Sequence, residues 1–71
     1  MINKVKENIK KLIGEKHQFR YNGARNQIEI FEGIIIEVYQ AIFIIKIDFP
    51  KKELKSFTYS DILINNLEII K

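Results

Sequence analysis

The spacing of the apolar residues changes at Gly14, and this change constrains the fold more than any other feature of the chain. Before Gly14, apolar residues recur at steps of three and four, which places them on one face of a helix. They are Ile2, Val5, Ile9, Leu12 and Ile13. Glycine readily adopts the left-handed conformation that follows a helix C-terminus. We therefore predict a helix over residues 1–13 that is stabilised by packing on a core, since so short a helix is marginal alone in water.

After Gly14 the apolar period falls to two, which is the period of a half-buried strand. In the first such segment, residues 16–21, the side chains of His17, Phe19 and Tyr21 share one face. The polar run over residues 22–26 begins with an Asn-Gly pair, and both residue types tolerate a positive φ. We therefore predict that this run is the loop of a hairpin.

Gly33 interrupts a long strand-like stretch over residues 28–39, and a glycine there predicts a bulge or a sharp bend. The two faces predicted for the second half of this stretch carry Ile34, Ile36 and Val38 on one side and Ile35, Glu37 and Tyr39 on the other. The remaining predicted elements are a central, most buried strand over 41–48, a polar turn at 50–53, a strand over 55–59, a 3₁₀ turn at 60–63 capped by Ser60 or Asp61, and a last strand over 67–70.

This order of elements predicts a mainly β fold. We expect one domain over residues 1–71, in which the N-terminal α-helix is followed by a small five-stranded SH3-like or Sm-like barrel over residues 15–71. The 3₁₀ turn precedes the last strand of this barrel. Closure of the barrel would protect isoleucine-rich strand edges that otherwise favour aggregation.

The composition argues against catalysis and against bound metals. The chain has 71 residues, no cysteine and one histidine, so it offers neither disulfides nor a thiolate metal site. Its nine carboxylates are scattered singly, and its three glycines are isolated, so no phosphate-binding loop is present. We interpret His17 as a packed or rim side chain. The expectation is a non-enzymatic protein without a cofactor.

The chain lacks the features of a membrane or secreted protein. No apolar run approaches the roughly 20 residues that span a bilayer, and the start of the chain lacks the apolar stretch of a signal peptide. We therefore expect a cytoplasmic location and no membrane partner.

The basic residues are concentrated in the first third of the chain. Residues 1–26 contain seven basic and two acidic side chains, whereas the whole chain has a net charge of +3. Cations interleaved with an aromatic ring can contact phosphates and stack a base; alternatively, the cations solubilise the fold and Tyr21 packs in it. The candidate contacts to nucleic acid or to a protein partner are Lys4, Lys11, Lys16, Arg20, Tyr21, Asn22, Arg25 and Tyr39.

Several segments of the chain resemble the Veg family, small cytoplasmic proteins of Gram-positive bacteria that are linked by name to biofilm stimulation. The similarity spans nearly the whole chain, and its most specific segment, residues 56–63, resembles the family pattern Ser-Tyr-Ser-Tyr-x-Asp-Val-Leu. The other similar segments are Leu12-Ile13-Gly14, Asn22-Gly23-Ala24-Arg25, Glu32-Gly33-Ile34-Ile35-Ile36-Glu37-Val38-Tyr39 and Ile42-Phe43-Ile44-Ile45. The resemblance implies an SH3-like or Sm-like fold and a role in regulating transcription through contact with a regulator, without a catalytic residue or a cofactor.

Three binding modes follow from these observations. In the first, the partner is a protein such as a transcriptional regulator, contacted through Tyr21, Phe31 or Tyr39. In the second, the partner is RNA or DNA, bound directly by the basic first hairpin. In the third, an unsealed barrel edge pairs with a second copy to form a homodimer or a ring.

Overall fold

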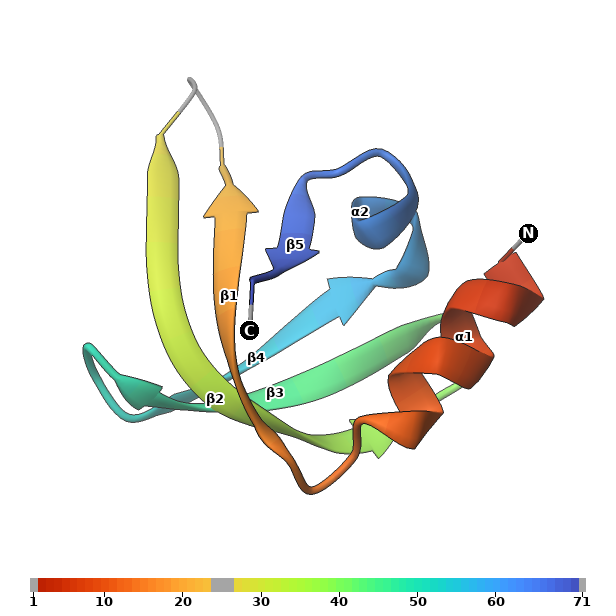
Figure 1. Cartoon of the computed structure of the whole chain (residues 1–71), viewed down its shortest axis with the longest axis horizontal. Coiled ribbons are helices and arrows are strands. Elements are labelled where there is room, and N and C mark those ends of the chain that lie inside the picture. The colour runs from red at the N-terminus through yellow and green to blue at the C-terminus, as the bar shows by residue number, and fades with distance from the viewer. Residues whose placement is uncertain (1, 24–26, 71) are drawn as a thin grey trace.

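The computed structural model describes residues 2–23 and 27–70. In chain order, the elements are α1 (Ile2–Lys11), β1 (Lys16–Asn22), β2 (Ile28–Val38), β3 (Ile42–Phe49), β4 (Glu53–Thr58), α2 (Tyr59–Leu63) and β5 (Leu67–Ile69). They confirm the prediction of a mainly β fold with an N-terminal helix. Figure 1 shows that β2 bends along its length. Its first half pairs with β1 and its second half with β3. No helix in the described parts of the chain is long and apolar enough to cross a membrane.

The five strands form one antiparallel sheet in the order β4-β3-β2-β1-β5. Within residues 2–23 and 27–70, the end strands β4 and β5 do not pair with each other, so the prediction of a closed barrel is wrong. The physical reason is that β5 is only three residues long and pairs with β1, while α2 lies between β4 and β5 in the chain. The centre of the sheet is β2, not β3 as predicted, although β3 contributes more fully buried side chains than any other strand.

The predicted irregularity at Gly33 is confirmed by a shift in the β2–β3 register between Glu32 and Gly33. A Cβ atom at Gly33 would lie 2.6 Å from the carbonyl oxygen of Lys46, so the two strands approach more closely than any side chain allows. A second shift, between Ile35 and Glu37, was not predicted. It overturns the predicted face of Ile34, Ile36 and Val38, because the extra residue in β2 leaves Ile36 exposed but turns Val38 toward the core, on the side of the buried Ile35.

Aromatic rings connect the strands through the core. The rings of Phe19 and Phe31 stack with centroids 5.4 Å apart, and Phe57 continues the stack from Phe31 at 5.9 Å. Phe43 stacks on Tyr59 at 5.6 Å. The buried hydrophobic residues are Ile9, Phe19, Phe31, Ile35, Phe43, Ile45, Ile47, Phe57, Tyr59 and Leu67. The core therefore receives side chains from all seven elements.

Helix α1 covers this core as predicted, although it ends at Lys11 and residues 12–14 form a turn. Ile9 is buried, and Val5 and Leu12 pack beside it. Gly14 has a φ of +88°, as expected for a glycine after a helix. Its N–H donates to the carbonyl of Ile35 at 3.0 Å, which fixes the end of the helix to the central strand.

The segment predicted as a 3₁₀ turn is the short α-helix α2, and its cap is Thr58 rather than Ser60 or Asp61. The Thr58 hydroxyl accepts a hydrogen bond from the N–H of Asp61 at 3.2 Å, and the Asp61 carboxylate accepts one from the N–H of Thr58 at 3.1 Å. This reciprocal capping box satisfies two backbone donors that would otherwise lack helical partners. Asp61 thus has a structural role in starting α2.

Candidate partner-binding surfaces

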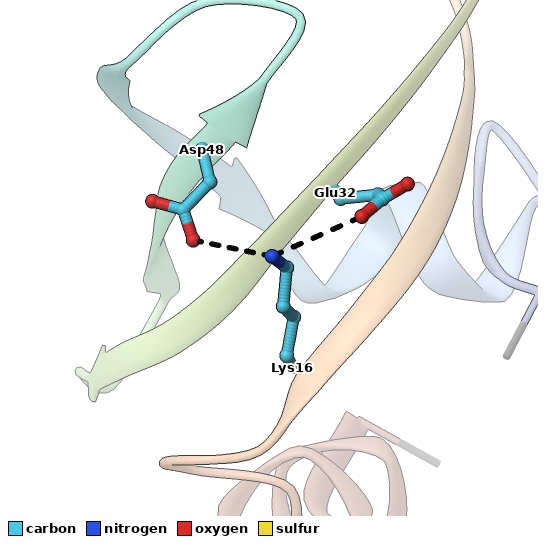
Figure 2. A network of polar contacts seen from close by, with 3 residues as sticks. All are labelled: Lys16, Glu32 and Asp48. Carbon is cyan, nitrogen blue, oxygen red and sulfur yellow. Dashed lines mark ion pairs between the residues drawn. The ribbon is translucent and has the colours of Figure 1, made fainter.

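The first predicted contact residue, Lys16, takes part in a small ionic network on the outer face of the sheet (Figure 2). Its Nζ lies 3.9 Å from Oε1 of Glu32 and 3.8 Å from Oδ2 of Asp48. Asp48 reaches this position because it is the extra residue at the register shift of β3, between Ile47 and Phe49. The three side chains are partly exposed, so the network contributes little to stability. It does offset the positive charge that Lys16 presents to a phosphate.

The other described residues of the predicted basic hairpin also have structural partners. Nη1 of Arg20 lies 3.6 Å from Oε1 of Glu68, directly across the β1–β5 pairing. The half-buried ring of Tyr21 packs edge-on against Phe57 at 5.2 Å. The N–H of Asn22 donates to the carbonyl of Asn66 at 2.6 Å.

Arg25 lies outside the described residues. A role of this hairpin in binding remains a prediction, but these contacts weaken its expected attraction for nucleic acid.

Tyr39 lies on the corner between β2 and β3, with about half of its surface exposed. Its hydroxyl donates to the Glu37 carboxylate, and this hydrogen bond, together with the negative charge of Glu37, raises the pKa of Tyr39 above 10.0. Its backbone carbonyl accepts a hydrogen bond from the buried hydroxyl of Tyr59. The corner is thereby anchored to the core while the Tyr39 ring faces outward.

The largest concave surface that we find lies between α1, α2 and β5, and its volume is about 540 Å³. Its apolar lining consists of Val5, Ile9, Leu12, Ile62, Leu67 and Ile69, and its polar lining of Asn8, Asn65 and Glu68. We call this surface the α1–β5 groove. Sequence reasoning missed it because its two walls are at least fifty positions apart in the chain and each wall, taken separately, has the pattern of an ordinary core face.

Two lysines stand beside the helical wall of the α1–β5 groove, although neither of them lines it. Lys4 and Lys11 stand four positions before and three positions after the groove residue Asn8, so both neighbour it on the helix surface. Both are exposed, and neither forms an ion pair with the described part of the chain. On the opposite wall, Glu68 is engaged by Arg20. Two of the predicted contact residues therefore lie beside an apolar groove that was not predicted.

The described residues contain no group of three or more histidine, cysteine or carboxylate side chains arranged to hold a metal ion. His17, the single histidine of the chain, packs edge-on against Phe19 at 6.4 Å. This contact agrees with the interpretation of His17 as a packed side chain.

Comparison with protein families gives a clear match over nearly the whole chain. The family model described as "Biofilm formation stimulator VEG" matches residues 1–70, which is nearly the whole chain. No curated protein matches the sequence.

Proposed function

The chain belongs to the biofilm formation stimulator VEG family, and from this premise we propose that it is a non-enzymatic regulatory protein of the cytoplasm that modulates transcription by binding a partner protein such as a transcriptional regulator. The observation that best supports this proposal is the α1–β5 groove. We also retain the SH3-like or Sm-like interpretation of the bent sheet, as an open member of the small-barrel class.

The α1–β5 groove has the character of a site for part of another protein. Its volume of about 540 Å³ falls within the range of roughly 300–1,000 Å³ for pockets that enclose ligands. An apolar floor with a polar rim suits a segment that inserts a few apolar anchors and keeps its polar groups in water. The floor is built from side chains that also pack on the core, such as Leu12, Ile62 and Ile69, so it is formed before the partner arrives.

The charge around the groove narrows the chemistry of the occupant. Lys4 and Lys11 lie beside the helical wall on the surface of α1, and the single acidic group of the lining, Glu68, is offset by Arg20. Complementary charge favours a correct partner and speeds its association. The occupant is therefore a short apolar segment of the regulator, flanked by aspartate or glutamate residues.

A peptide-binding experiment tests this function. Fluorescent peptides tiled across the transcriptional regulators of the host bacterium are titrated with the protein, and fluorescence anisotropy measures the affinity. The peptides that bind should carry apolar anchors with acidic flanks. The double reversal Lys4→Glu and Lys11→Glu should weaken their binding about tenfold or more, because it replaces two attractions by two repulsions. The matched control is Lys10→Glu with Lys51→Glu, which makes the same charge change at two exposed positions outside the groove lining and outside β4.

Equal binding by the two double variants would show that the α1–β5 groove is not the contact surface. The alternative of direct nucleic-acid binding is measured in the same assay with single-stranded RNA, single-stranded DNA and duplex DNA at about 50 mM and about 200 mM salt. Binding that weakens steeply with salt and is lost when Lys16 and Arg20 are reversed to glutamate would favour that alternative.

A further inference from the structure

Strand β4 forms one end of the sheet, and its outer edge pairs with no other strand in the described residues. Leu54 stands on this edge with 64 % of its surface exposed, which is the largest exposed fraction of any large hydrophobic side chain described. Beside it is a shallow hollow of about 380 Å³, lined by Ile36, Ile47 and Leu54 and bordered by charged side chains. An unpaired strand edge that carries an exposed leucine is a template for pairing with another strand.

The charges on β4 are arranged symmetrically about Leu54. Glu53 precedes it and Lys55 follows it. In the β3–β4 pairing, Glu53 stands opposite Ile47 and Lys55 opposite Ile45. Because both isoleucines are buried in the core, the two charged residues belong to the inner, core-facing side of the sheet. Leu54 stands opposite Lys46 on the outer face. Three consecutive positions of the edge are therefore acidic, apolar and basic. Within one chain, Nζ of Lys55 lies 3.9 Å from Oε1 of Glu53 and 3.9 Å from Oε2 of Glu29, so the pairing proposed below would extend an existing ionic cluster to a second copy.

We propose that β4 pairs antiparallel with β4 of a second copy of this chain, about a two-fold axis at Leu54. A two-fold axis normal to the sheet keeps the inner faces of both copies on the same side. In that arrangement, the residue on the axis stands opposite the same residue of the second copy. With Leu54 at the centre, each leucine meets its counterpart, and Glu53 of each copy stands opposite Lys55 of the other.

The neighbouring registers are less favourable, because like charges placed directly opposite each other in a sheet are destabilising. Centring the pair on Glu53 places two carboxylates together, and centring it on Lys55 places two ammonium groups together. Centring it on Ser56 places Lys55 opposite Phe57 and removes both ionic contacts. Among these four registers, the one centred on Leu54 is the one that pairs opposite charges.

The opposite end of the sheet is a poorer partner for β4. Strand β5 has three residues against six in β4, so pairing β4 with β5 of another copy makes a shorter ladder. That head-to-tail contact would also produce rings or filaments rather than a closed dimer. The two arrangements differ in mass and in which residues meet their own copies, so experiment can separate them.

Single-cysteine variants test the register directly, because the natural chain contains no cysteine. Leu54→Cys places two thiols opposite each other across the axis, at a spacing of about 5 Å that approaches disulfide geometry. Ser56→Cys is the matched control, since it lies on the same outer face of β4 but faces Lys52 of the partner. Under mild oxidation, Leu54→Cys should give a covalent dimer in high yield and Ser56→Cys little. Equal yields from the two variants, or a higher yield from Ser56→Cys, would overturn the proposal.

Light scattering on the unmodified chain and a charge swap complete the test. The wild type should have twice the chain mass of 8.5 kDa at micromolar to millimolar concentration. Glu53→Lys and Lys55→Glu should each shift it toward the monomer, because each brings like charges together across the axis. The double variant places opposite charges across the axis again, but it also puts a carboxylate beside Glu29 of the same chain, so the dimer should return in part. A wild-type mass of one chain throughout, a mass of three or more chains, or a double variant that stays monomeric would each contradict the pairing. Circular dichroism identifies any variant that fails to fold, and the cysteine experiment then decides.

The β4 pairing is independent of the proposed function. The β4 edge and the α1–β5 groove involve different residues, and reversal of Lys4 and Lys11 leaves β4 unchanged. Failure of one proposal is therefore distinguishable from failure of the other.

Discussion

Replacement of Gly33 by alanine tests whether the close approach of β2 and β3 is required by the fold. The added Cβ would lie 2.6 Å from the Lys46 carbonyl oxygen, 2.9 Å from a methyl carbon of Ile45 and 3.1 Å from the Cα of Ile47. Carbon atoms normally pack at about 3.5–4.0 Å. The nearest atom belongs to the backbone and cannot rotate away, so the strands themselves must separate. Overpacking of a core costs about 1–3 kcal/mol, and we expect about 3 kcal/mol here because backbone has to move.

This loss is a large part of the stability available to so short a chain. At roughly 0.05–0.15 kcal/mol per residue, a chain of 71 residues has a free energy of unfolding of roughly 4–11 kcal/mol. Each kilocalorie per mole of lost stability lowers the midpoint of thermal unfolding, Tm, of a domain of this size by roughly 4–8 °C. A loss of about 3 kcal/mol in Gly33→Ala should therefore lower Tm by roughly 12–24 °C. Urea and thermal unfolding followed by circular dichroism measure both quantities.

The control is Gly23→Ala, whose Cβ would meet its nearest neighbours at an ordinary distance of 3.5 Å. It should change stability by less than about 0.5 kcal/mol. The reasoning would be refuted if Gly33→Ala were as stable as the wild type within that margin, or if the two alanine variants were equally destabilised.

Three further changes probe the helix ends and the buried tyrosine. Gly14→Ala should cost about 1 kcal/mol in the same urea assay, because its φ of +88° strains a side chain although the space around it is open. Thr58→Ala removes half of the capping box of α2 and should also cost about 1 kcal/mol, whereas Thr58→Ser should retain most of the stability. Burial raises the pKa of Tyr59 above 10.0, so its contribution is fully present below pH 10 and is lost as pH rises through the folded-state pKa. The variant Tyr59→Phe should therefore lose less stability between neutral and strongly alkaline pH than the wild type does.

Local patterns were sufficient to predict most of the secondary structure, although the predicted 3₁₀ turn is the α-helix α2. The strand predicted over residues 16–21 is β1, and the one predicted over 41–48 is β3 shifted by one residue. Alternation of apolar and polar side chains depends on neighbours along the chain, so it is visible without the fold. The irregularity at Gly33 was equally predictable, because a glycine inside a strand pattern is typical of a bulge or of a closely approaching backbone.

The predictions that were wrong or missing concern features that depend on contacts between distant segments of the chain. The shift at Ile36 was not predictable because three consecutive isoleucines fit either face of a strand. The ionic network of Lys16 requires Asp48, which a register shift in another strand brings within 3.8 Å. The excess of basic residues in the first third of the chain led to the prediction that Lys16 contacts a partner. In the folded sheet, two carboxylates lie beside it.

The two proposed contact surfaces lie toward opposite ends of the sheet, and this separation affects how the molecule acts. Pairing through Leu54 would bury the edge at β4 and leave β5, with the α1–β5 groove beside it, open in both copies. A dimer would therefore present two identical grooves. When a partner offers two matching segments, the second contact forms at the high effective concentration set by the first, so modest affinity for one segment becomes tight binding of the pair. A chain with one small groove could in this way hold a dimeric regulator while binding a single copy of the same segment weakly.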